Sequence, residues 1–443
     1  MVEIQIPEKV NKIIHTLQEH GYEAYAVGGC VRDSFLGREP MDWDITTSAM
    51  PEETKALFPH TFDTGIEHGT ITVLLDHEGF EVTTYRVDGK YEDSRHPKEV
   101  IFVRNLQEDL LRRDFTINAM AYNEKEGLVD IFGGMDDLKA GIIRCVGNAQ
   151  ARFSEDALRI LRGIRFAAQL GFELEDETRE GMRLLAPTLR KISAERIQVE
   201  LVKTLTSSRP DLLREAWKLG ITKEFLPEFD LAMETTQETV HHMYTVGEHI
   251  LHTLLEVRPD RILRLTMLLH DIGKPYMKTM DADGVAHFKG HPEKSSELAN
   301  EILHRLKFDN DTIRKVTKLV RYHDHRMPVT PAHVRRAVHE IGEDLFPLYL
   351  EVRRADVAAQ SMYQHKEKVA DIDGVEKLYH EIMERKECVS LKMLAVTGKD
   401  LIAAGMKPGK EIGQILEHFL DLVLEHPELN QKEELLKRIE LSV

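Results

Sequence analysis

The chain has 443 residues, of which 42% are hydrophobic and 30% charged, and it carries a formal net charge of −17. This length is enough for roughly two to four domains, and the negative charge excludes an indiscriminate coat on nucleic acid, although one local basic face can still bind RNA. Three widely spaced cysteines exclude a disulfide framework, and no apolar run reaches the roughly 18 residues of a membrane-spanning helix, so we expect a cytoplasmic protein with no membrane partner.

The first predicted elements surround a glycine pair. Residues 1–20 have a helical pattern, and an apolar strand over Ala24–Val27 breaks at Gly28-Gly29, after which a short helical pattern ends at Gly37. A glycine pair between strand and helix lets the backbone approach a phosphate closely, and the helix start offers free N–H groups to it. Gly28 and Gly29 are therefore predicted to bind a nucleotide, with a plain turn as the alternative.

A pair of carboxylates follows. Asp42-Trp43-Asp44-Ile45 is predicted to be a strand, and on a strand Asp42 and Asp44 project from the same face. Two carboxylates can hold Mg²⁺ against a nucleoside triphosphate. Residues 68–86 alternate in polarity and predict a β-hairpin, in which Glu81 is either a third carboxylate of this site or a solvated edge residue.

The order of these residues resembles a known family. Gly-Gly-Cys-Val-Arg-Asp at 28–33, followed by Asp-Trp-Asp at 42–44, is similar to the signature of the nucleotidyltransferases that build tRNA 3′ ends and bacterial poly(A) tails. From about residue 20 to 205 the chain resembles a class II CCA-adding enzyme. The resemblance implies an α+β, polymerase-beta-like head followed by helical domains, with Mg²⁺ as cofactor, tRNA, CTP and ATP as partners, and Arg32 holding the nucleotide.

Two further stretches carry the resemblance. Arg112-Arg113-Asp114 before an apolar helix resembles a second family motif, in which Arg113 contacts the triphosphate or ribose, and arginine is a forked donor suited to phosphate oxygens. Residues 87–105 are charged and aperiodic, and Arg95-His96-Pro97 resembles the flexible loop of complete CCA-adding enzymes. CC-adding relatives lack that loop, so its presence favours full CCA synthesis.

A basic helix is predicted next. Ser154 is a plausible N-cap and Gly171 ends the helix, which places Asp156 and Arg159 three residues apart on one side. Cytosine and adenine both present an amino donor beside a ring-nitrogen acceptor, so an Asp acceptor beside an Arg donor matches both. Guanine and uracil present the reverse order, and each mismatched buried polar group costs about 1–3 kcal/mol.

The alternative for this pair is an ordinary surface ion pair. Glu-Asp-x-x-Arg, however, matches the base-reading motif of the class II family, which implies that Asp156 and Arg159 select the nucleotide and that Arg162 and Arg165 contact its triphosphate. The amphipathic helix predicted at 192–205 resembles a supporting motif and receives no catalytic role. From about residue 205 onward the sequence predicts only helices.

A second motif set lies in this helical region. A His-Asp dipeptide with an upstream His and a distal Asp resembles the HD-domain phosphohydrolases, and imidazoles with carboxylates bind first-row transition metals. The metal-ligating candidates are His249, His270, Asp271, His291, His323 and Asp356. His291 and His323 have the spacing of variants that hold two metals, although His325 competes with His323, and Asp324 with Asp356.

The sequence predicts four parts: a nucleotidyltransferase head at 1–140, a helical neck at 141–205, a body with an HD domain at 206–370 and a helical tail at 371–443. The predicted reaction is attack of the tRNA 3′-hydroxyl on the α-phosphate of CTP, twice, and then of ATP, with hydrolysis of RNA-end phosphoesters at the HD site. A scaffold kept only for tRNA contact is the alternative there.

The rival interpretations are a bacterial poly(A) polymerase and an A-adding or CC-adding specialist. Two alternatives belong to other functional classes. They are an HD phosphohydrolase with a tRNA-binding head and a non-catalytic RNA-binding protein. The acidic charge and the HD ligands count against the first rival. The sequence indicates neither an oligomeric state nor the identity of the HD-site metal.

Overall fold

The computed structural model describes residues 4–88 and 100–439, which form two compact units, Met1–Pro227 and Glu228–Val443. The predicted division into four parts stays a prediction within these units. Arg95-His96-Pro97, the predicted flexible-loop segment, lies outside the described residues. Within the described ranges, no helix is long and apolar enough to cross a membrane.

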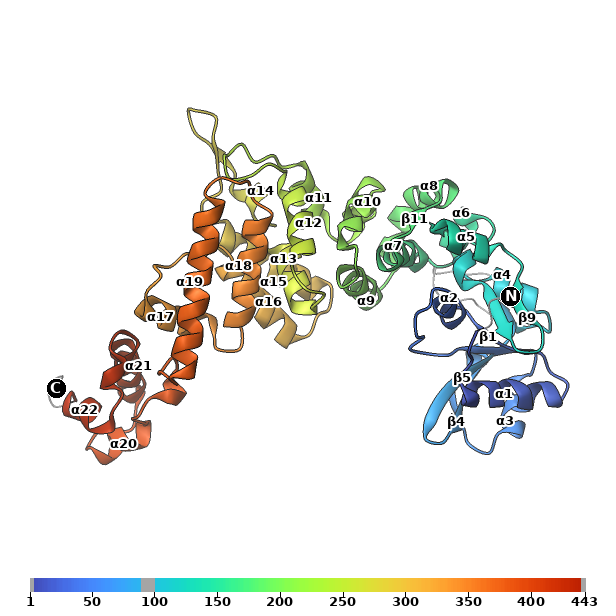
Figure 1. Cartoon of the computed structure of the whole chain (residues 1–443), viewed down its shortest axis with the longest axis horizontal. Helices are drawn as coiled ribbons and strands as arrows, with labels where there is room; N and C mark the ends of the chain where they lie inside the picture. Colours follow the sequence, from blue (N-terminus) through green and yellow to red (C-terminus); the bar gives the residue numbers. More distant parts are fainter. Residues whose placement is uncertain (1–3, 89–99, 440–443) are drawn as a thin grey trace. The chain divides into compact units, whose positions relative to one another are not determined.

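The first unit contains a mixed seven-stranded sheet in the order β3-β4-β5-β2-β1-β8-β9. Its strands are β1 (Ala24–Val27), β2 (Ile45–Thr47), β3 (Thr61–Gly65), β4 (Thr70–Leu75), β5 (Glu78–Thr84), β8 (Met120–Asn123) and β9 (Gly127–Asp130). Only the β2–β5 pair is parallel. Helices α1 (Glu8–Glu19) and α3 (Pro51–Leu57) lie beside each other against this sheet, and α2 (Gly29–Phe35) follows β1 (Figure 1). The β4–β5 hairpin confirms the alternation predicted at 68–86.

Two predicted boundaries in this unit are wrong. The first helix begins at Glu8 rather than within the first residues, because Pro7 precedes it with extended backbone (φ −56°, ψ 142°). Strand β2 begins at Ile45, so Asp42 and Asp44 lie in the extended segment before the strand. Only the carbonyl of Asp44 is joined to β1, through the N–H of Val27 at 3.0 Å.

The rest of the first unit is largely helical. It comprises β6 (Arg86–Asp88), β7 (Val100–Phe102), α4 (Leu106–Leu111), α5 (Gly134–Ala140), β10 (Ile142–Ile143), α6 (Ala149–Glu155), α7 (Leu158–Leu170), β11 (Glu173–Leu174), α8 (Asp176–Leu185), α9 (Ala194–Leu205) and α10 (Leu213–Lys218). The helix predicted to begin at Ser154 is two helices that break at Asp156. Asn148 caps α6 by accepting the Ala151 N–H, and Gly171 ends α7 at φ 74°, as predicted.

The second unit is helical except for one short hairpin of β12 (Thr279–Met280) and β13 (Ala286–His287), which corrects the all-helical prediction. Its helices are α11 (Pro227–Glu234), α12 (Val246–Glu256), α13 (Arg261–Leu269), α14 (Lys274–Met277), α15 (His291–Arg305), α16 (Asn310–Tyr322), α17 (Pro331–Ile341), α18 (Phe346–Ala358), α19 (His365–Glu384), α20 (Gly398–Ala403), α21 (Lys410–Glu425) and α22 (Lys432–Lys437). One buried cluster joins α16 to α19, and a second forms around α21.

Candidate functional site

A cavity of about 770 Å³ in the first unit brings together all the residues predicted there to act on a nucleotide. They come from the β1–α2 turn and α2, the segment before β2, the residues after α4, the break between α6 and α7, and α7 itself. The cavity is lined by Gly28, Gly29, Arg32, Asp42, Asp44, Arg113, Asp156, Arg159, Arg162 and Arg165, together with Arg38, Arg112, Asp114, Asn118, Phe166 and Arg196. Glu81 is not among its lining residues.

Gly28 allows the backbone to turn at the cavity floor. Its φ of 85° is unfavourable for residues with a side chain, and a β-carbon at this position would lie 3.0 Å from Nη1 of Arg113. The turn thus depends on glycine both for its backbone conformation and for the close approach of that guanidinium.

Asp42 and Asp44 are exposed side chains on the cavity wall, two residues apart. Neither carboxylate has a hydrogen-bond or ion-pair partner within residues 4–88 and 100–439. Desolvation by the cavity wall and the neighbouring charge of Asp42 raise the pKa of Asp44, against the opposing charge of Arg113. Adjacent carboxylates that repel each other and have no protein donor are suited to a divalent cation.

Two arginines on the cavity wall are oriented by acidic residues. Arg32 donates from Nε and Nη2 to Asp33 at 2.9 and 3.0 Å, and from Nη1 to Asn118 Oδ1 at 2.6 Å. The fully buried Asp109 accepts from Arg113 Nη2 at 3.4 Å, while Arg113 Nε has no hydrogen-bond partner among the described residues. Arg113 lines the cavity and its side chain is 19% exposed, so its guanidinium places positive charge where an anion would bind.

Arg162 and Arg165 of α7 differ in how far their side chains are exposed to a ligand in the cavity. Arg162 donates from Nε to Asp114 Oδ2 at 2.6 Å and retains a side chain that is 35% exposed. Arg165 is 8% exposed and forms an ion pair with the buried Glu200 at 3.1 Å. Both guanidinium groups lie over the Phe166 ring. The structure therefore offers Arg162 to a ligand more openly than Arg165.

The Asp114–Arg162 pair predicts a pH dependence of stability. Burial alone would raise the pKa of Asp114, but the charge and hydrogen bond of Arg162 lower it to about 2. A depressed carboxyl pKa contributes stability above the unfolded pKa of about 4, and this contribution is lost as the pH falls towards 2. We expect the difference in unfolding free energy between wild type and Asp114→Asn to shrink by about 1 kcal/mol from pH 7 to about pH 3.

Urea unfolding followed by tryptophan fluorescence measures this difference, because Trp43 and Trp217, the two tryptophans of the chain, both lie in the first unit. Asp63→Asn, which removes an exposed ion pair with Lys55, is the control and should show a nearly constant difference. A constant difference for Asp114→Asn as well would contradict the assignment.

Asp156 and Arg159 both line the cavity, and the Arg159 N–H donates to the Asp156 carbonyl at 3.1 Å. Asp156 ends α6, and its carboxylate accepts from Arg196 Nη2 at 2.7 Å and from the Leu158 N–H at 3.0 Å. Arg159 donates to the Arg112 carbonyl at 2.8 Å and to Glu155 at 2.7 Å. Arg159 thus forms an ion pair with Glu155, and Asp156 forms one with Arg196.

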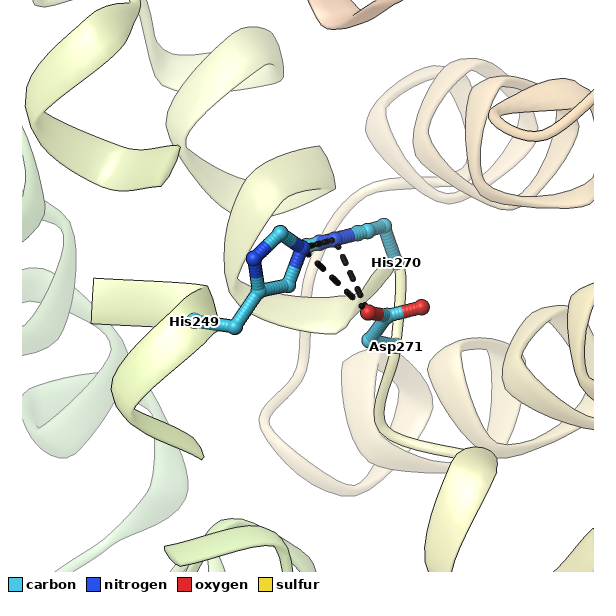
Figure 2. A group of neighbouring side chains, drawn as sticks. All are labelled: His249, His270 and Asp271. Atoms are coloured by element: carbon cyan, nitrogen blue, oxygen red, sulfur yellow. Dashed lines mark hydrogen bonds and ion pairs between the residues drawn. The ribbon is translucent and has the colours of Figure 1, made fainter. Parts of the chain in front are cut away.

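The second unit gathers four predicted metal-ligating histidines around the carboxylate of Asp271. Figure 2 shows His249 and His270 beside Asp271. Asp271 Oδ2 lies 3.5 Å from His249 Nε2 and 3.4 Å from His270 Nε2. Asp271 Oδ1 lies 3.3 Å from His291 Nε2 and 3.4 Å from His323 Nε2. Each oxygen of the buried carboxylate thus faces its own pair of imidazoles.

Backbone carbonyls orient the four imidazoles. The Nδ1 atoms of His270, His291 and His323 lie 2.7–2.8 Å from the carbonyls three residues earlier in the chain, and Nδ1 of His249 lies 3.3 Å from the Ala359 carbonyl. A carbonyl only accepts, so each Nδ1 carries the proton and each Nε2 presents a lone pair to the centre. This is the tautomer that a metal ligand requires.

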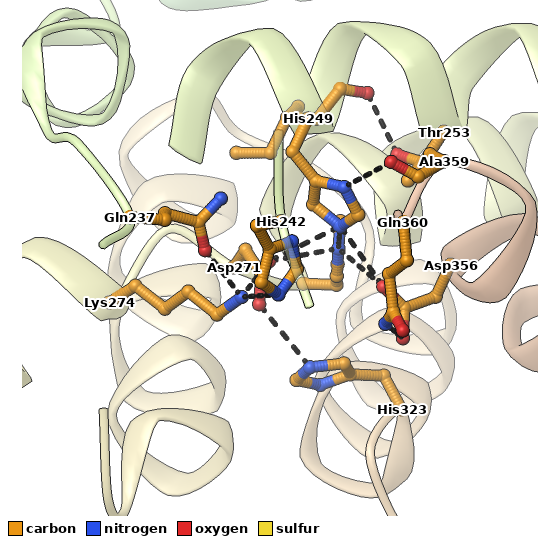
Figure 3. A network of polar contacts seen from close by, with 12 residues as sticks. Gln237, His242, His249, Thr253, Asp271, Lys274, His323, Asp356, Ala359 and Gln360 are labelled. Carbon is orange, nitrogen blue, oxygen red and sulfur yellow. Dashed lines mark hydrogen bonds and ion pairs between the residues drawn. The ribbon is translucent and has the colours of Figure 1, made fainter. Parts of the chain in front are cut away.

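Asp356 completes the group and resolves one of the alternatives (Figure 3). Its Oδ1 lies 3.0 Å from His249 Nε2, whereas Asp324 forms ion pairs with Arg326 and Arg353. The ring of His325 packs on Tyr322 instead of entering the cluster. The structure therefore brings Asp356 and His323 into the group, and not Asp324 or His325.

Four of the metal candidates line a cavity of about 800 Å³, namely Asp271, His291, His323 and Asp356, whereas His249 and His270 are fully buried behind them. Lys274, one helical turn after Asp271, places its buried Nζ 2.7 Å from Asp271 Oδ2 and 3.0 Å from Gln237 Oε1. Burial alone would raise the pKa of Asp271, but the charges of Lys274 and His270 hold it well below its usual range. The two carboxylates, Asp271 and Asp356, outnumber the one lysine of this group, which favours bound cations.

Sequence reasoning missed several lining residues. The sequence predicts only a supporting role for the helix that carries Arg196, but the Arg196 side chain lines the first cavity from α9. Lys274 and Gln237 were not singled out, and only the i+3 spacing of Lys274 from Asp271 gave a usable signal. The contacts of Gln237 and Arg196 join segments far apart in the sequence, which periodicity does not reveal.

Three family models match parts of the chain. They are described as "Poly A polymerase head domain" over residues 24–144, "Probable RNA and SrmB- binding site of polymerase A" over 171–233 and "tRNA nucleotidyltransferase domain 2 putative" over 290–439. The CCA-adding enzyme of Levilactobacillus brevis is 37% identical, with 92% of this chain and 91% of the relative covered. That of Pediococcus pentosaceus is 35% identical, with 98% and 97% covered.

Among solved structures, the CCA-adding enzyme of Bacillus stearothermophilus in complex with CTP has a TM-score of 0.71 at 28% identity, with 99% of both chains covered. The tRNA-complexed enzyme of Thermotoga maritima, at 21% identity and a TM-score of 0.60, shares the fold. The mixed sheet and the matched head model define a nucleotidyltransferase head of the poly(A) polymerase class. Because full-length relatives match nearly end to end, the chain belongs to the CCA-adding enzyme family.

Proposed function

We propose that this protein adds CCA to the 3′ end of tRNA from CTP and ATP. The observation that carries the proposal is that a single cavity contains Asp42 and Asp44, phosphate-binding arginines, and both members of the Asp156 and Arg159 pair. A catalytic pair, a triphosphate cradle and a base-reading pair within one cavity match the demands of untemplated nucleotide addition.

The residues of this cavity would bind the triphosphate and the Mg²⁺ ion. Gly28 leaves room for the triphosphate beside Arg113, and the Arg32, Arg113 and Arg162 guanidiniums bind its oxygens. Asp42 and Asp44 would hold Mg²⁺, which supplies charge stabilisation for the transferring phosphate when bound. The tRNA 3′-hydroxyl forms the new bond to the α-phosphorus, and pyrophosphate leaves.

Base selection is assigned to the neck. The Asp156 carboxylate accepts from the amino group of cytosine or adenine, and Arg159 donates to the adjacent ring nitrogen. Uracil and guanine would place a carbonyl oxygen against the carboxylate, and the unpaired groups would cost about 1–3 kcal/mol each.

The test uses tRNA transcripts that lack CCA, lack only the terminal A, or are complete, each incubated with labelled CTP and ATP. We expect two cytidines and one adenosine, one adenosine, and no addition, respectively. Long A-tails would identify a poly(A) polymerase, and addition limited to A or to CC would identify a specialist. No incorporation by the wild-type protein would remove the transferase proposal.

We also propose that the second unit is a metal-dependent phosphohydrolase of the HD type that acts on RNA-end phosphoesters. The specific observation in its favour is a buried group of four histidines around Asp271, each of whose oxygens faces two imidazoles, with Asp356 beside His249. Transition metals bound there would supply Lewis-acid activation for phosphoester hydrolysis. Lys274 and the cavity-lining Lys289 and Arg326 provide positive charge for the phosphate.

Metal removal tests this second activity. Dialysis against a strong chelator should abolish hydrolysis of p-nitrophenyl phosphate and 2′,3′-cyclic nucleotides, and Mn²⁺, Fe²⁺ or Zn²⁺ should restore it. CCA addition assayed afterwards with Mg²⁺ should be unchanged, because the two sites lie in separate compact units. A protein that binds no metal and hydrolyses neither substrate would instead have a scaffold that serves tRNA contact alone.

A further inference from the structure

The carboxylate assigned to base reading is held by a residue outside the base-reading motif. Arg196 of α9 donates from Nη2 to Asp156 Oδ2 at 2.7 Å and from Nη1 to Asp156 Oδ1 at 3.4 Å, and it lines the same cavity. We propose that Arg196 is a specificity-determining positioning residue, which acts by fixing the orientation of the Asp156 carboxylate. The inference rests on the proposed nucleotidyl transfer.

The hydrogen bonds around Asp156 leave it little freedom. A carboxylate offers about four acceptor positions on its two oxygens. Two bonds from Arg196 and one from the Leu158 N–H occupy three of them, so about one position remains for a base. A single fixed acceptor suits the one exocyclic amino group on the pairing edge of cytosine or adenine.

Arg159, the other residue of the base-reading pair, is held by hydrogen bonds that do not involve Arg196. Arg159 Nη2 donates to the Arg112 carbonyl at 2.8 Å, and its Nη1 donates to Glu155 at 2.7 Å and to the Arg152 carbonyl at 3.0 Å. Arg196 contacts none of these groups. Loss of Arg196 would therefore release the acceptor of the pair and leave the donor in place.

A released carboxylate would favour the wrong bases in a defined order. Guanine presents two adjacent donors, N1–H and the N2 amino group, which match both oxygens of a carboxylate that is free to turn. Uracil presents only N3–H. Without Arg196 we expect the discrimination against GTP to fall most and the discrimination against UTP to fall less. The reaction with CTP and ATP should change little.

The experiment compares kcat/KM for all four nucleoside triphosphates in wild type, Arg196→Gln and Arg196→Lys. For Arg196→Gln we expect the ATP-to-GTP ratio on tRNA ending in CC to fall about tenfold or more. Arg196→Lys, which keeps one charged donor, should give an intermediate ratio. Lys203→Gln is the matched control, since Lys203 is exposed on the same helix away from the cavity, and its ratio should equal that of wild type.

A double-mutant cycle separates positioning from direct contact with the nucleotide. Dissociation constants of ATP and GTP are measured by calorimetry for Arg196→Gln, Asp156→Ala and the double variant. If Arg196 acts through Asp156, its substitution changes nothing further in the Asp156→Ala background. Equal, additive losses of ATP and GTP binding would instead show that Arg196 contacts the nucleotide, and would overturn the inference.

The outcomes also distinguish this inference from the proposed function. A wild-type protein that incorporates neither CMP nor AMP would remove the transferase proposal itself. A wild-type protein that adds CCA, with Arg196→Gln and Arg196→Lys both folded and as selective as wild type, would refute only the role of Arg196. Thermal melting of each variant establishes that it is folded.

Discussion

Asp42→Ala is expected to lower the incorporation of CMP and AMP into tRNA by about a thousandfold or more, because the charge on the transferring phosphate would lose most of its stabilisation. Asp44→Ala should have a similar effect, since the two carboxylates lie two residues apart and share one cavity without protein donors. Single-turnover incorporation with saturating nucleotide measures the chemical step directly.

Asp63→Ala is the matched control for this prediction. Asp63 is an exposed carboxylate on β3 of the same sheet, paired only with Lys55 and outside the cavity, so its loss should leave the rate near that of wild type. An Asp42→Ala protein that folds and keeps more than about a tenth of the wild-type rate would contradict the assignment of the carboxylate pair.

If the second unit holds two metal ions as proposed, Asp271→Asn is expected to remove both and to abolish the proposed phosphoester hydrolysis. A bridging carboxylate serves both positions, so we expect about two metal equivalents in wild type and a background level in the variant. His249→Ala and His323→Ala each affect only one imidazole pair and should each retain about one equivalent. Elemental analysis of the purified proteins gives these stoichiometries.

His325→Ala provides the control for the metal analysis. His325 lies two residues after His323, but its ring packs on Tyr322 outside the ligand group, so the metal content and hydrolysis should match wild type. Full metal content in Asp271→Asn would show that the carboxylate does not bridge. Unchanged CCA addition in the same variant would place the two activities in independent units.

The sequence predicts the local features of the transferase site well. The Gly28-Gly29 turn, the β4–β5 hairpin and the end of α7 at Gly171 each depend on short-range backbone preferences or alternation, which a sequence displays directly. The break at Asp156 was not predicted. At this break the Asp156 carboxylate accepts from the Leu158 N–H and from Arg196, which lies 40 residues away in the sequence.

The candidate metal ligands are likewise only partly predictable from the sequence, because some depend on contacts between distant segments. His270-Asp271 is recognisable as a dipeptide, but the choice of Asp356 over Asp324 depends on the packing of α12 against α18. The approach of Lys274 to Gln237 likewise joins different segments of the second unit. Such contacts follow from tertiary packing, so the residue pattern alone left both alternatives open.

The most direct test of the account is to sequence tRNA 3′ ends after incubation with all four nucleoside triphosphates at equal concentration. No nucleic-acid template is supplied, and our proposal assigns the selection of nucleotides to Asp156 and Arg159. We expect every extended tRNA 3′ end to have the sequence CCA, with no further nucleotide added. Ends with frequent U or G, or with long runs of A, would contradict base reading by this pair.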